Sequence, residues 1–175
     1  RGTAQVGLRT FLPLFVVNEL GGNAIWAGAI LMVFQGAGAL STPFVGSASD
    51  KFGRAPVMFV GLAVSAVGII ILTFATNLVV YAATVAVIGA SLLALRPVVQ
   101  GWALDQTPQE LGGSTISILF TTQAAFGMSI PYLGGVVADN FGLDATFRML
   151  AGLAIVAAAA AYWAHAYQRR RDRLA

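Results

Sequence analysis

The sequence predicts an all-α transmembrane bundle of six helices, built as two inverted repeats of three. Composition gives the membrane class: 58% of the 175 residues are hydrophobic and 10% are charged, whereas a soluble domain is about one quarter charged. An internal repeat gives the architecture, because a short phrase recurs on either side of the middle of the chain. Repeated groups of helices are typical of secondary transporters.

Six apolar stretches are long enough to cross a bilayer, which takes about 20 mostly apolar residues. Short polar or Gly-rich breaks separate them, so successive helices are expected to be antiparallel neighbours. In chain order the stretches are residues 4–20, 25–48, 56–76, 78–103, 114–138 and 146–167, and the breaks between them are residues 21–23, 49–55, 76–77, 104–113 and 140–145. Residues 1–175 are therefore expected to form a single domain, with one repeat at about 4–76, a second at about 78–167 and a cytoplasmic tail at 168–175.

The repeated phrase is Gly46-Ser-Ala-Ser-Asp50-Lys-Phe52-Gly53 in the first half and Gly135-Val-Val-Ala-Asp139-Asn-Phe141-Gly142 in the second. A Gln precedes each copy, and a Pro follows that Gln eight residues later (Gln35 and Pro43, Gln123 and Pro131). Because the spacing is kept, the two copies are interpreted as equivalent positions of two structural repeats.

Basic residues gather on one predicted side of the membrane. Lys51, Arg54 and the tail residues 169–173 fall there with Arg1, and Arg148 falls opposite. Lys and Arg are in excess in cytoplasmic loops, so both termini are predicted to be cytoplasmic in a plasma or inner membrane. Trp26 and Tyr81 are expected to anchor the opposite interface. Clustering at a membrane edge also argues against nucleic-acid binding, despite the net charge of +3.

Small residues in the second and fifth stretches are expected to let helices approach closely, which drives helix packing in lipid. They are Gly36, Gly38, Ala39 and Ser41 in one stretch and Gly127, Ser129, Gly134 and Gly135 in the other.

The phrase Gly46-x-x-x-Asp50-Lys51-x-Gly53-Arg54 resembles the signature loop of the major facilitator superfamily. The resemblance implies that the six helices are one half of a twelve-helix fold, with the other six-helix half as a partner. It also implies that the loop residues Gly46, Asp50, Lys51, Gly53 and Arg54 form a conformational latch, in which Lys51 and Arg54 pair with acids of the partner half. The alternative is a turn that only signals topology. Ala55 departs from the pattern, which usually has another basic residue there.

Two further motifs bear on which half the chain represents. Pro131-x-x-Gly134-Gly135 and Arg96-x-x-x-Gln100-Gly101 resemble motifs of N-terminal halves, but each differs in spacing from the pattern. The basic tail favours the C-terminal half, and the N-terminal half stays an alternative.

Five polar residues inside the spans are candidates for lining a solute cavity, because ionisable and polar groups within a bilayer are costly and are commonly functional. They are Arg9, Gln35, Arg96, Gln100 and Gln123. For the arginines the alternative is snorkelling to the interface, and for the amides it is hydrogen bonding between helices. Glu19, Asp105 and Glu110 are expected in loops, and His165 at the interface.

No catalytic set is present in the sequence, and without Cys and with one His there is no His/Cys metal cluster. We therefore expect no enzyme and no cofactor. The predicted function is part of a secondary active transporter that moves a small solute by alternating access, driven by a proton or solute gradient, with uptake and efflux both open. The alternative is a non-transporting membrane bundle that acts as an assembly or receptor-like module.

Overall fold

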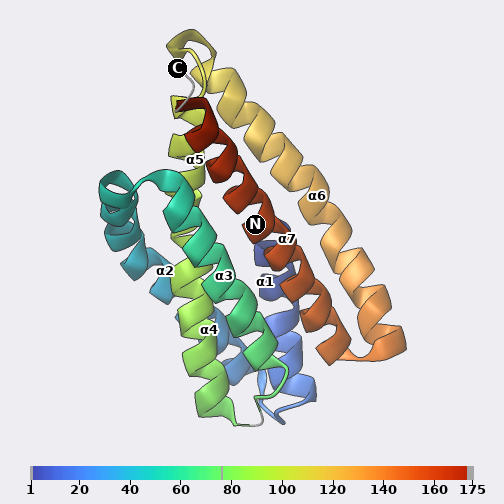
Figure 1. Ribbon diagram of the computed structural model, residues 1–175. Helices are drawn as coiled ribbons and strands as arrows, with labels where there is room; N and C mark the ends of the chain where they lie inside the picture. Colours follow the sequence, from blue (N-terminus) through green and yellow to red (C-terminus); the bar gives the residue numbers. More distant parts are fainter. Residues whose placement is uncertain (1, 76, 173–175) are drawn as a thin grey trace.

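The computed structural model describes residues 2–75 and 77–172, with side chains described as far as residue 163. Regular structure in these ranges is entirely helical (Figure 1). In chain order the elements are α1 (Gly2–Asn18), α2 (Ala24–Phe52), α3 (Arg54–Leu72), α4 (Leu78–Leu93), α5 (Leu95–Asp105), the single 3₁₀ turn η1 (Gln109–Leu111), α6 (Gly112–Phe141) and α7 (Leu143–Asp172). The predictions for Arg1, His165 and the tail 168–175 concern side chains outside this description.

The prediction of six helices is confirmed, since α4 and α5 together make one long helical stretch. Ala94 between them keeps a helical backbone, with φ −64° and ψ −18°. Five of the six stretches are long and apolar enough to cross a membrane. The exception is α1, whose 17 residues give a length of about 26 Å, slightly less than the roughly 30 Å of a bilayer core.

Three of the five breaks between helices, those after α2, α5 and α6, are shorter than the sequence predicts, whereas those after α1 and α3 are longer. Residues 49–52 were expected in a loop, but α2 continues to Phe52, and Gly53 alone separates it from α3. A polar last turn stays helical where it can emerge into water. Gly53 turns the chain at φ +93°, and Gly142 makes the equivalent turn at φ +84°. Both values lie in a region that side chains disfavour, which confirms that Gly53 is needed for a tight turn.

The two repeats match residue for residue as far as the prolines of their long helices, after which Asp139 lies one residue later in α6 than Asp50 does in α2. Counted from the first residues of α2 and α6, Gln35 and Gln123 are both the twelfth, and Pro43 and Pro131 are both the twentieth. Packing follows the same equivalence, because α2 packs against α4 as α6 packs against α1, and α3 packs against its counterpart α7. In Figure 1, α1 and α4 run in opposite directions, as an inverted repeat requires.

An aromatic cluster holds α1, α4 and α7 together in the core. The rings of Phe15 and Tyr81 stack with centroids 5.3 Å apart, and Phe147 meets Phe15 edge-on at 5.3 Å. The Tyr81 hydroxyl donates to the Leu12 carbonyl at 3.2 Å. The prediction that Tyr81 anchors the membrane interface is therefore wrong, because its ring is fully buried and its hydroxyl has a partner inside the bundle. Trp26, by contrast, is exposed.

Only some of the predicted small residues bring helices close. A Cβ on Gly38 would meet Leu93 of α4, and one on Gly134 would meet Phe11 of α1. Ser41 also joins α2 to α4, donating to the Ala90 carbonyl at 2.8 Å. Gly36 and Gly135 have no neighbouring atoms within 4 Å of such a Cβ, so these two do not pack within this bundle.

Candidate functional site

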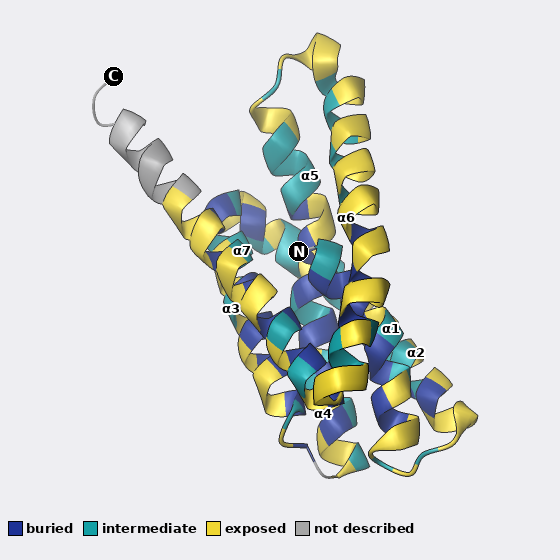
Figure 2. Cartoon of the chain, turned by 90° about the vertical axis from the view of Figure 1, so that its right-hand side faces the viewer, coloured by how far each residue is buried: buried dark blue, intermediate teal, exposed yellow. Residues whose placement is uncertain are grey.

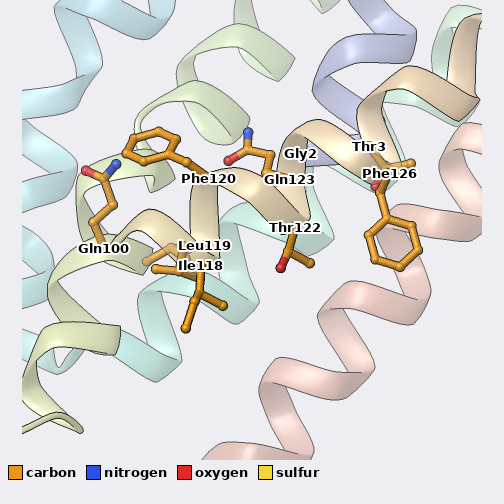
Figure 3. A pocket seen from close by; sticks show the side chains of 10 residues that line it. Gly2, Thr3, Gln100, Ile118, Leu119, Phe120, Thr122, Gln123 and Phe126 are labelled. Atoms are coloured by element: carbon orange, nitrogen blue, oxygen red, sulfur yellow. The ribbon is translucent and has the colours of Figure 1, made fainter. Parts of the chain in front are cut away.

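A cavity of about 260 Å³ lies where the start of α1 meets α5 and α6. Its walls are mostly apolar and aromatic, with a few hydroxyl and amide side chains (Figure 3). The lining residues are Gly2, Thr3, Val99, Gln100, Ile118, Leu119, Phe120, Thr122, Gln123 and Phe126. Two of the five predicted cavity residues therefore line the same cavity: Gln100 from α5 and Gln123 from α6.

Arg96 lies beside this cavity. Its guanidinium carbon is 5.5 Å from the centroid of the Phe120 ring, and Phe120 is a lining residue. Cations favour the negative face of an aromatic ring, an interaction of about 0.5–1 kcal/mol at exposed sites. Gln100 is one helical turn further along α5, on the same face. Arg96, Gln100 and Gln123 thus form one group.

Arg9 and Gln35 form a second group. The Arg9 Nη2 atom donates to the Gln35 Oε1 atom at 3.4 Å, so the pair joins α1 to α2. Both residues are exposed. The residues lining the cavity do not include Gln35, contrary to the prediction that it would share one with Gln123. Arg9 is seven residues beyond Gly2, which puts both on one face of α1, about 10 Å apart along its axis.

Gln5 is not among the cavity residues that the sequence predicts, because it lies near the start of an apolar stretch, where a polar residue is not unusual. The structure buries it to 6% exposure, and its Oε1 atom has no hydrogen-bond partner in the part of the chain that is described. Gln5 is one turn before Arg9 on α1. Its burial depends on helix packing, which no sequence pattern marked.

We expect Gln5→Leu to raise the thermal stability of the transporter. A buried acceptor that lacks a donor costs about 1–3 kcal/mol, whereas an apolar side chain of similar size avoids that cost. Thermal unfolding in detergent measures the effect. Gln100→Leu, at a half-exposed cavity position, is the control and should leave the stability nearly unchanged. A loss of stability in Gln5→Leu would show that Oε1 has a donor in the folded protein.

The signature loop makes a salt bridge inside this half. The Arg54 Nε atom is 3.0 Å from the Asp105 Oδ2 atom, with the side chains 29% and 53% exposed. Asp105 was predicted in a loop but ends α5, within reach of Arg54. Pairing of Arg54 with an acid of the partner half stays a prediction. Arg54 also packs against Gly101, where any side chain would collide with the guanidinium. An ion pair this exposed stabilises a fold by about 1 kcal/mol at most.

The other loop residues face outward. Asp50 and Lys51 are exposed, and the Lys51 Nζ atom lies 5.6 Å from the ring centroid of its neighbour Phe52. A Cβ on Gly46 would have no atom within 4 Å, so Gly46 makes no close helix contact within this half. These groups are available to a partner on the outer surface.

Among the residues described, no group of three His, Cys, Asp or Glu side chains could hold a metal ion. The arrangement is instead that of a polytopic helical membrane protein with inverted repeats and polar groups in mid-helix, which defines a membrane transporter. The family model described as Major Facilitator Superfamily matches residues 2–174. The chain therefore belongs to the major facilitator superfamily, whose members are transporters and not enzymes, and it corresponds to one half of that fold.

Similar curated proteins are named for multidrug resistance. The multi-drug resistance efflux pump PmrA of Streptococcus pneumoniae is 29% identical over 152 residues, which cover 85% of this chain and 38% of PmrA. The multidrug resistance protein MdtG of Yersinia enterocolitica is 27% identical over 157 residues, covering 87% of this chain and 37% of MdtG. The chain thus spans less than two fifths of the length of these relatives.

Proposed function

We propose that this chain is one half of a secondary transporter that exports small solutes by alternating access, driven by a proton or solute gradient. The observation that carries the proposal is the family match over residues 2–174. The name of PmrA, an efflux pump, supports export over uptake. The polar groups on α1, α2, α5 and α6 support a solute path along this half.

We propose that the partner is a second six-helix half, and that the present chain is the C-terminal one. The two equivalent helices α2 and α6 are the least covered by this bundle: 17% and 11% of their most apolar segments are buried, against 33–39% in the other candidate spans. Figure 2 shows α6 exposed along most of its length. An equivalent pair of uncovered helices supports an interface with another half.

We propose that the signature loop acts as a latch between conformational states. The salt bridge from Arg54 to Asp105 joins the start of α3 to the end of α5. It fixes the loop on this half and leaves Asp50 and Lys51 exposed. A latch needs one anchored side and one side free to engage a partner that moves between states.

The test of the transport function is solute movement by the whole transporter. The full-length protein is reconstituted into proteoliposomes, and accumulation of fluorescent drugs is measured with and without a proton gradient. Gradient-dependent movement of any of them supports the proposal. Solute binding without movement under either gradient would favour the receptor-like module instead.

We expect both ends of the chain to lie on the cytoplasmic side, because the basic residues segregate to one side. The test is labelling of single Cys variants of the full-length protein with a membrane-impermeant thiol reagent. The replaced residues are Lys51, Asn77 and Asp144, which are all exposed. Lys51→Cys should label only from inside, and Asn77→Cys and Asp144→Cys only from outside. Labelling of all three from one side would contradict this topology.

A further inference from the structure

Charges are sorted by depth along the helices. All seven acidic residues are at or beside a helix end, in η1 or in the loop after α1: Glu19, Asp50, Asp105, Glu110, Asp139, Asp144 and Asp172. Two arginines, in contrast, are well inside helices. Arg9 is the eighth of the 17 residues of α1, and Arg96 is nine residues before the end of α5, about 14 Å along the axis. The middle of this half therefore carries positive charge and no carboxylate.

Among the side chains described, neither arginine is paired with a carboxylate. Arg9 donates to an amide oxygen of Gln35, and Arg96 lies on the face of the Phe120 ring. The salt bridge found among the described side chains joins two other residues, Arg54 and Asp105, near the helix ends. Both mid-helix arginines are exposed on the surface of this half. A charge in a membrane interior is stable only when it is paired or hydrated. We therefore expect these guanidinium groups to bind an anion in the whole transporter.

The Arg96 guanidinium remains well inside the helical bundle. It lies over Phe120, which is eight residues into α6 from Gly112, about 12 Å along the axis, against about 14 Å for Arg96 along α5. A side chain that snorkels fully would extend to the membrane surface. Phe120, the ring that Arg96 contacts, lines the cavity together with Gln100 and Gln123 (Figure 3). Arg9, at the middle of α1, is similarly held by Gln35.

We propose that the exported solutes are amphipathic organic anions, whose carboxylate, sulfonate or phosphonate group is bound by Arg96 beside the cavity and by Arg9 at a second position along the same path. This rests on the proposed transport function. Arg donates paired hydrogen bonds to such groups. Gln100 and Gln123 add uncharged donors and acceptors, and Ile118, Phe120 and Phe126 offer apolar walls for the rest of the solute. An aromatic or aliphatic anion fits this lining better than a drug cation, which the two arginines would repel.

The test compares two probes of similar shape and opposite charge in the full-length transporter. Carboxyfluorescein is the anion, and rhodamine 123, built on the same kind of ring system, is the cation. Gradient-driven transport of each is measured in proteoliposomes for Arg9→Gln, Arg96→Gln and the charge-preserving Arg9→Lys and Arg96→Lys. Arg148→Gln is the matched control, because Arg148 is exposed near the start of α7, away from both groups.

Each change to Gln should lower carboxyfluorescein transport roughly tenfold, the scale expected for losing one hydrogen bond to a charged group. The Lys variants keep the charge but lose the paired hydrogen bonds, so their transport should fall less than that of the Gln variants, and Arg148→Gln should retain all of it. Thermal unfolding supplies a second readout that does not need active variants. Carboxyfluorescein should raise the melting temperature of the wild type, and rhodamine 123 should not.

The outcomes separate this inference from the transport function. Wild-type transport of rhodamine 123 alone, or equal losses for both probes in the Gln variants, would overturn the anion site and indicate that a carboxylate of the other half pairs with the arginines. A melting temperature that rises with anionic lipid, but not with carboxyfluorescein, would assign the arginines to lipid headgroups. A carboxyfluorescein shift without any transport would uphold the anion site and overturn the transporter proposal.

Discussion

Gly89→Leu should abolish the folded transporter, because α4 has no room for a side chain at this position. A Cβ on Gly89 would collide with the backbone carbonyl of Phe34 in α2. A flexible side chain could move aside, but the backbone of a helix cannot do so without separating α2 from α4. These helices share one of the largest packing interfaces of the bundle. Overpacking of a core costs about 1–3 kcal/mol and sometimes more, and this position belongs at the upper end.

The measurement is the yield of monodisperse protein in detergent, together with its thermal unfolding. Gly38→Leu should behave in the same way, because Gly38 faces Leu93 and the Gly89 carbonyl across this interface. The control is Gly152→Leu: Gly152 is also within a helix, but it has open space where a Cβ would be. Wild-type yield and stability in Gly89→Leu would refute the close packing of α2 on α4.

The sequence was enough to predict the helices and their repeat, because both depend on local pattern. Apolar length marks each span, and the spacing from Gln35 to Pro43 recurs from Gln123 to Pro131 at the same helical positions. Tertiary contacts were harder to predict. Tyr81 was assigned to the interface from its place near the start of a span, yet stacking on Phe15 and a hydrogen bond to Leu12 draw it into the core. Which face a residue occupies is decided by the neighbouring helices.

The candidate site shows the same division. The unusual presence of Arg9, Gln35, Arg96, Gln100 and Gln123 in apolar stretches was visible in the sequence, since such residues are rare there. Their grouping was not, because the Arg9–Gln35 hydrogen bond joins residues 26 apart and the contact of Arg96 with Phe120 joins two helices. Asp105 was assigned to a loop because polar residues follow it closely. The helix continues two residues beyond the predicted end at 103, and Asp105 at its end lies beside Arg54.

Asp50→Asn should reduce transport about tenfold, a change equivalent to about 1.4 kcal/mol, and leave the melting temperature nearly unchanged. Asp50 is exposed in the last turn of α2, so its charge contributes little to the stability of this half. Its nearest basic neighbours within the loop are occupied otherwise, since Arg54 pairs with Asp105 and Lys51 lies by Phe52. If the loop is a latch, Asp50 is the free acid that engages the other half in one conformational state.

The second repeat provides a matched control for this charge. Asp139 is also exposed and is also third from the end of its helix, α6, just before the equivalent glycine turn at Gly142. Asp139→Asn removes the same charge from the opposite end of the bundle, where no basic residue follows within the repeated phrase. Initial transport rates, normalised to protein abundance in the membrane, should therefore fall in Asp50→Asn and hold in Asp139→Asn. Wild-type activity in both variants would indicate that the loop around Asp50 is only a turn that signals topology. An equal loss in both would indicate that transport needs an acid at each of the two helix ends.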